Sequence, residues 1–76
     1  MIRFDIYETG TGKLGRTFRC CDGMFGYDLF MSICDYLMRR FGLSFLEAED
    51  AASWCELSVV GESYEAFDFV ICVEEE

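Results

Sequence analysis

Residues 2–7 alternate apolar side chains with more polar ones, which is the period of a half-buried β-strand. Apolar residues take every second position at the start: Ile2, Phe4 and Ile6. Residues 10–13 include two glycines, which tolerate the positive φ of a tight turn. A return strand over residues 14–21 places Phe18 inward, and Arg16 shares its parity, so an inward Arg16 has to lie near a sheet edge. The pattern predicts a β-hairpin.

The spacing of apolar residues then changes to that of an amphipathic helix. They recur every three or four positions along one face: Phe30, Ile33, Cys34, Leu37, Met38 and Phe41. Two basic residues, Arg39 and Arg40, precede Gly42 and favour a helix end there. The sequence therefore predicts a helix over residues 27–41.

A second helix is indicated by Ser44 and, three residues later, Glu47, the pattern of a capping box. We expect this helix to run from Ser44 to about Glu56. One of its faces consists of small side chains alone: Ala48, Ala51, Ala52 and Cys55. Small side chains allow a helix to approach its neighbour closely, so this face predicts close packing against a neighbouring element.

The last third of the chain predicts a short strand over 57–60, a turn over 61–63 and a longer strand over 64–74. In the longer strand Phe67, Phe69, Ile71 and Val73 share one face. The whole chain, residues 1–76, is predicted to be a single domain of the α+β class. Its expected architecture is a three- or four-stranded antiparallel sheet with two helices on one face, in the order β-β-α-α-(β)-β.

The net charge of -9 is unevenly distributed along the chain. All six basic residues lie in positions 1–40 beside five acidic ones, whereas positions 41–76 hold ten acidic residues and no basic one. Binding to nucleic acid or to an anionic membrane requires a cationic protein surface, so we expect neither as a direct partner. The charge favours a basic protein partner, or serves solubility alone.

Targeting and redox features favour the cytoplasm. The chain contains no apolar stretch near the roughly 20 residues that span a bilayer and no apolar leader after Met1. Its five cysteines are an odd number without a regular disulfide spacing. Cys34, Cys55 and Cys72 lie among apolar residues and are expected to be buried, whereas adjacent Cys20 and Cys21 should leave one thiol exposed.

Candidate catalytic chemistry is sparse. Residues 10–15 form a G-x-G-x-x-G string, but a strand follows them where a dinucleotide fold requires a helix, so a hairpin turn is the better interpretation. The chain has no histidine, which removes the commonest general base and most zinc sites. The acidic residues match no calcium-binding loop. We therefore expect no enzymatic activity, no cofactor and no metal.

The remaining candidate site is the acidic surface of the second half. Its expected partner-binding residues lie on the second helix, the following turn and the last strand: Glu47, Glu49, Asp50, Trp54, Glu56, Glu62, Glu65 and Asp68. Such carboxylates can imitate a phosphate backbone, with Trp54 or Tyr64 as an aromatic anchor. A solvated surface without a partner is the plainer interpretation of the same residues.

In size and charge the chain resembles small acidic inhibitors of phages and mobile elements, of the anti-restriction and anti-CRISPR type. These proteins share no common fold, so no residue role is carried over. The resemblance implies a non-enzymatic interaction protein that binds the basic surface of a nucleic-acid-binding enzyme as a nucleic-acid mimic. The alternative is a structural or adaptor domain that forms a homodimer, or joins a larger assembly, through an apolar sheet face.

Overall fold

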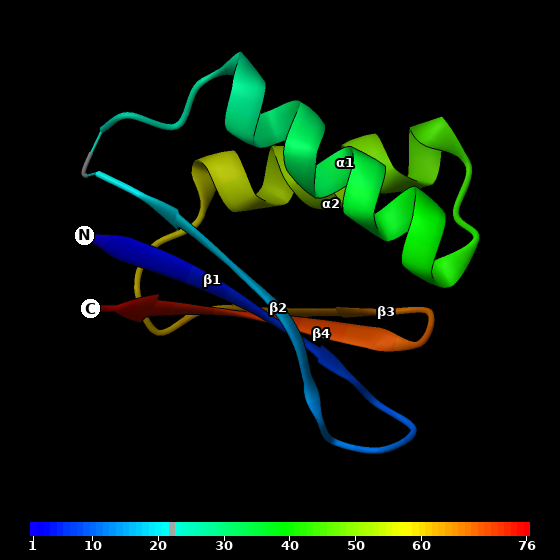
Figure 1. Cartoon of the computed structure of the whole chain (residues 1–76). Coiled ribbons are helices and arrows are strands. Elements are labelled where there is room, and N and C mark those ends of the chain that lie inside the picture. Colours follow the sequence, from blue (N-terminus) through cyan, green and yellow to red (C-terminus); the bar gives the residue numbers. More distant parts are fainter. Residues whose placement is uncertain (22) are drawn as a thin grey trace.

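Four strands and two helices follow one another in the order β-β-α-α-β-β in the computed structural model, which describes residues 1–21 and 23–76 (Figure 1). The elements are β1 (Ile2–Glu8), β2 (Leu14–Cys20), α1 (Tyr27–Phe41), α2 (Phe45–Leu57), β3 (Ser63–Ala66) and β4 (Phe69–Glu75). The strands form one antiparallel sheet in the order β2-β1-β4-β3. Both helices lie on one face of it (Figure 1). The predicted α+β architecture is confirmed, and the sheet has four strands.

The helix boundaries follow from local chemistry. α1 ends at Gly42, which has φ +70° and donates its N–H to the carbonyl of Met38. α2 begins after Ser44 with the predicted capping box: the Ser44 hydroxyl accepts from the Glu47 N–H at 3.2 Å, and the Glu47 carboxylate accepts from the Ser44 N–H at 2.8 Å. Both helices are confirmed to within one residue at each end.

The hydrophobic core lies between the helices and the sheet. The sheet contributes Phe4, Ile6, Phe18, Phe69, Ile71 and Val73, α1 contributes Ile33, Cys34 and Leu37, and α2 contributes Ala48, Ala51, Ala52 and Cys55. All four small residues of α2 are buried, and the neighbour against which α2 packs is α1. The small face allows the two helix backbones to approach, so α1 and α2 form one layer above the sheet.

A β-bulge in the first hairpin fixes the position of α1 relative to β2. The register shifts after the pair Ile6 and Arg16, which leaves Gly15 as an extra residue on β2. A Cβ atom at Gly15 would lie 2.5 Å from the Tyr36 hydroxyl of α1. A side chain at residue 15 would therefore have to displace the Tyr36 hydroxyl, which lies over the β2 backbone.

The last third of the chain differs from the prediction in two places. Residues 57–60 form no strand: α2 extends through Leu57, and Val59 and Val60 lie exposed in the loop before β3. The predicted strand over 64–74 is interrupted by a two-residue turn at Phe67 and Asp68, so it folds back as the hairpin of β3 and β4.

This turn has no local sequence pattern that predicts it. Phe67 has φ +52°, a conformation that glycine adopts much more readily, and its side chain is 59% exposed instead of facing the core. The pairs Tyr64 with Ile71 and Ala66 with Phe69 hold the two strands together. Pairing between strands therefore overrides the alternation that makes residues 64–74 look continuous.

The sheet face away from the helices is polar at its centre. The Asp5 side chain lies there in the middle of the sheet, and the residue is only 3% exposed. Its carboxylate accepts from the Arg3 Nε–H at 3.0 Å and from the Thr17 hydroxyl at 2.8 Å. A buried carboxylate needs such partners, and the bond from Thr17 also links β2 to β1.

The cysteines follow the sheet and helix faces. Cys34 and Cys55 are buried, as predicted, and of the adjacent pair Cys20 and Cys21 it is Cys21 that is exposed. Cys72 is half-buried rather than buried, because it alternates with Ile71 and Val73 and so faces the side without helices.

Candidate functional site

The predicted partner-binding residues divide between two flanks of α2 and the β3 hairpin. On α2, Glu47, Asp50 and Trp54 recur at helical spacing on one flank, whereas Glu49 and Glu56 lie on the other. Glu62 precedes β3, Glu65 lies on it and Asp68 lies in the following turn. The structure thus brings most of the predicted residues to the β3 edge of the sheet and separates Glu49 and Glu56 from them. Asp68 lies at the end of the sheet, in a small pocket that Glu8 and Arg40 also line.

Trp54, Tyr64 and Asp50 form the centre of this edge. The rings of Trp54 and Tyr64 lie 5.3 Å apart between centroids at an interplanar angle of 39°. The Tyr64 hydroxyl donates to the Asp50 carboxylate at 3.5 Å, a long contact. Burial and the Asp50 charge raise the pKa of Tyr64. The helix flank and the edge strand therefore present two aromatic rings beside a carboxylate.

We call this region the β3-side surface, defined as Glu47, Asp50, Trp54, Glu62, Tyr64, Glu65 and Asp68. Glu65 pairs with Val70 and points to the opposite sheet face from Tyr64, so acidic side chains flank the edge strand on both sides. Two of the acids have structural duties: Glu47 caps α2, and Glu62 accepts from the Val59 N–H at 2.9 Å. The carboxylates of Asp50, Glu65 and Asp68 are exposed, and none of them accepts a hydrogen bond from a backbone N–H in the described residues.

Glu49 and Glu56 have other surroundings. The Glu49 charge adds to burial in raising the pKa of Cys34, so Glu49 lies toward α1. Glu56 lines an apolar groove of about 320 Å³ with Phe25, Tyr27 and Phe30 at the start of α1. These two residues therefore face the α1 side of the molecule.

Ion pairs explain why the β3-side surface keeps its charge. Among the described residues, the paired arginines are Arg3 with Asp5, Arg19 with Glu76, Arg39 with Asp35 and Arg40 with Glu8. The acids in these pairs come from the first half of the chain and from the C-terminus. No described carboxylate between residues 47 and 68 has a basic side chain within ion-pair distance.

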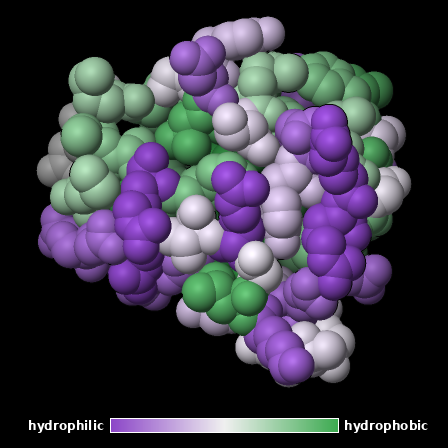
Figure 2. Space-filling model, in the orientation of Figure 1, coloured by the Kyte–Doolittle hydropathy of each residue, from purple (hydrophilic) through white to green (hydrophobic). Residues whose placement is uncertain are grey.

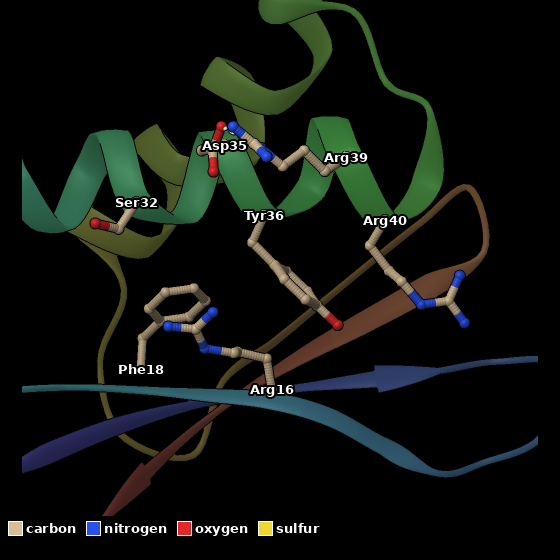
Figure 3. Close-up of a pocket in the computed structure, with 7 residues that line it drawn as sticks. All are labelled: Arg16, Phe18, Ser32, Asp35, Tyr36, Arg39 and Arg40. Atoms are coloured by element: carbon tan, nitrogen blue, oxygen red, sulfur yellow. Dashed lines mark hydrogen bonds and ion pairs between the residues drawn. The ribbon is translucent and has the colours of Figure 1, made fainter.

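The opposite edge carries a cleft that the sequence analysis did not identify. It lies between β2 and α1, has a volume of about 420 Å³ and is lined by Arg16, Phe18, Ser32, Asp35, Tyr36, Arg39 and Arg40 (Figure 3). We call it the arginine cleft. In the view of Figure 2, strongly hydrophilic side chains alternate with apolar ones on this side of the molecule and form no single continuous patch.

Arg16 is distinctive within the arginine cleft. Its guanidinium lies 4.6 Å from the ring centroid of Phe18 and 5.9 Å from that of Tyr36, and no described carboxylate pairs with it. Figure 3 shows Arg16 lying along Phe18, whereas Arg40 points away from it. Arg16 shares the inward face of β2 with Phe18 and lies at a sheet edge, as expected. This position was the only indication of the cleft in the sequence.

The described residues offer few chemically reactive groups. Burial raises the pKa of Cys55 to about 12, and burial also raises the pKa of Cys34, so both thiols are neutral near pH 7. Residues 1–21 and 23–76 contain no group of three or more cysteine, aspartate or glutamate side chains that could hold a metal ion. No helix in this part of the chain combines the length and apolar character needed to cross a bilayer.

The arrangement is therefore one of two contrasting edges, an acidic one with two aromatic rings and one with an arginine cleft. No protein-family model, curated protein or solved structure matches this chain.

Proposed function

We propose that the protein is a non-enzymatic interaction domain whose β3-side surface binds a basic protein surface and competes there with nucleic acid. The observation that carries the proposal is the set of carboxylates on the β3-side surface, which also holds the Trp54 and Tyr64 rings; none of these carboxylates has a basic side chain within ion-pair distance among the described residues. Unpaired acids attract lysine and arginine over long range, and half-buried aromatic rings provide the short-range contact that hot spots need.

The alternative, an adaptor that uses an apolar sheet face, finds less support. The sheet face without helices has the buried Asp5 at its centre, paired with the half-buried Arg3 and with Thr17. Covering this face would also bury Arg19 and Glu74, which raises the desolvation cost of an interface. The β3-side surface keeps its charges in solvent until a partner of opposite charge arrives.

The proposal is tested with two charge-reversal variants of equal net charge. The first carries Asp50→Lys, Glu65→Lys and Asp68→Lys on the β3-side surface. The second carries Asp28→Lys, Glu56→Lys and Glu75→Lys, which are exposed acids elsewhere. Wild-type protein captures its partner from the native cytosol, and the purified partner is then used to measure affinity for each variant and for duplex DNA or RNA.

We expect the β3-side variant to lose partner affinity by about a hundredfold or more and the control variant by less than about fivefold. Nucleic acid should displace the wild-type protein, and raising the salt concentration should slow association. Equal losses for the two variants, or simultaneous binding of protein and nucleic acid to the partner, would refute the proposal.

A further inference from the structure

The second edge of the sheet has the features of a binding site for an extended strand. β2 spans seven residues, Leu14–Cys20, and its only strand neighbour in the described chain is β1. Edge strands of this length expose backbone groups that a further strand can pair with, and proteins usually protect them. Here the usual protection by covering chain is absent from the described residues.

The register shows which backbone groups are free. Thr9 N–H donates to Asp68 and Glu76 N–H donates to Met1, so odd-numbered residues of β1 bond to β4 and even-numbered ones bond to β2. In β2, Arg16 and Phe18 lie opposite even-numbered residues and turn their backbone groups toward β1. Thr17 and Arg19 lie between them and turn their N–H and C=O groups outward.

The side chains along this edge have the opposite charge to the rest of the molecule. β2 carries Arg16 and Arg19 and no acidic residue. Arg16 is held against Phe18 and Tyr36 without a carboxylate partner, so its guanidinium donors are free for a ligand. Arg39 and Arg40 line the same cleft from α1 (Figure 3).

We propose that β2 and the arginine cleft together form a second binding site, which takes an extended acidic peptide segment as a fifth strand of the sheet. The peptide backbone pairs with Thr17 and Arg19, and successive side chains alternate between the two sheet faces. Those on the helix face enter the arginine cleft, where a carboxylate meets Arg16. Opposite charges on adjacent strands stabilise such pairing.

Charge complementarity selects this occupant over a second copy of the chain. β2 against β2 would bring the arginines of two copies, Arg16 on one sheet face and Arg19 on the other, to the same seam without any acidic side chain, and like charges on adjacent strands repel. β2 against the acidic β3 of another copy would pair seven residues with four. This head-to-tail contact between two different edges also does not close on itself, so it would join copies into filaments. The site goes beyond the function proposed for the β3-side surface and lies on the other edge.

The test uses a fluorescein-labelled seven-residue peptide that alternates glutamate and threonine, with binding followed by fluorescence anisotropy. One matched peptide has lysine for glutamate. A second is N-methylated at alternate amides, which removes the backbone donors needed for strand pairing but keeps the charge. Arg16→Glu tests the cleft, and Lys13→Glu makes the same charge change in the hairpin turn.

Arg19→Pro tests the edge because proline removes the outward N–H, and Arg19→Ala controls for the lost charge. We expect saturable binding of the acidic peptide, a loss of about tenfold or more for Arg16→Glu and less than about threefold for Lys13→Glu. Arg19→Pro should weaken binding by about fivefold beyond Arg19→Ala. If Arg19→Pro does not fold by circular dichroism, the N-methylated peptide tests the same hydrogen bonds.

Three results would overturn the inference. The first is an absence of saturable binding below about 1 mM peptide. The second is equal binding of the N-methylated and unmodified peptides, which would reduce the contact to charge alone. The third is self-association in sedimentation velocity that Arg16→Glu abolishes, without peptide binding, which would assign the edge to a second copy.

Discussion

The two edges of the sheet differ in how their charges are satisfied. At the β2 edge, three nearby arginines are paired with acids: Arg19 with Glu76, Arg39 with Asp35 and Arg40 with Glu8. On the β3 side, no described carboxylate between residues 47 and 68 has a basic side chain within ion-pair distance. Five acids without an ion pair, Glu47, Asp50, Glu62, Glu65 and Asp68, thus lie on the β3-side surface, whereas the acids nearest the β2 edge are neutralised by arginines.

The difference matters because paired and unpaired charges act differently in binding. An exposed ion pair contributes little to stability and attracts little at a distance, whereas uncompensated charges of one sign steer a partner. The two edges also share one core, because ring contacts run from Phe18 of β2 through Tyr36 and Phe41 to Phe69, and from Phe69 to Tyr64 of β3. The contrast can therefore be tested by breaking the shared core or by changing one edge alone.

The largest effect should come from Phe69→Ala, which removes the shared core residue. Phe69 is fully buried, so the cavity should lower the free energy of unfolding by about 3–5 kcal/mol, close to the whole stability of a small domain. Urea unfolding followed by Trp54 fluorescence measures this. Leu46→Ala, at a side chain that is 74% exposed, should cost less than about 0.5 kcal/mol. A folded Phe69→Ala protein of near wild-type stability would contradict the core assignment.

A smaller effect, confined to the β2 edge, is expected for Gly15→Ala. The added methyl group would lie 2.5 Å from the Tyr36 hydroxyl and should lower the free energy of unfolding by about 1–3 kcal/mol. Tyr36→Phe removes that oxygen and should recover much of the loss in the double variant. The four proteins form a double-mutant cycle in urea. If the two substitutions prove additive, Tyr36 does not rest on Gly15.

The buried Cys55 thiol of α2 should make the free energy of unfolding fall at alkaline pH. Burial raises the pKa of Cys55 from 9.0 in its ordinary state to about 12. Because the folded state retains this proton, the stabilising contribution is complete below pH 9 and is lost as the pH rises toward 12. One such group steepens the loss by up to about 1.4 kcal/mol per pH unit. Urea unfolding across this range should show a shallower slope for Cys55→Ala, and identical slopes would contradict the burial of this thiol.

The smallest effect concerns the turn that builds the β3 edge. Phe67 has φ +52°, so a variant with glycine at this position should be more stable than one with alanine by about 1 kcal/mol. Both variants lose the Phe67 ring, which makes the pair a matched comparison in thermal or urea unfolding. Greater stability of the alanine variant would show that the turn does not need a positive φ.

Local patterns in the sequence were sufficient for both helices and the first hairpin. The apolar spacing of α1, the capping box at Ser44 and the αL residue Gly42 act over one or two turns of chain, so they can be recognised without knowing the fold. The small face of α2 was also recognisable in the sequence, because Ala48, Ala51, Ala52 and Cys55 recur at helical spacing and small side chains allow close packing; all four are buried. The acidic character of the second half followed directly from the charges.

The tertiary structure decided which of these residues meet. The β3–β4 turn depends on pairs such as Tyr64 with Ile71, while alternation alone made the segment look like one strand. The acidic residues of α2 were divided by the packing of its small face, which placed Asp50 and Trp54 at Tyr64 and turned Glu49 toward α1. The arginine cleft joins Arg16 of β2 to Tyr36 of α1. Contacts between residues distant in sequence arise only when the elements pack, so periodicity within one element cannot predict them.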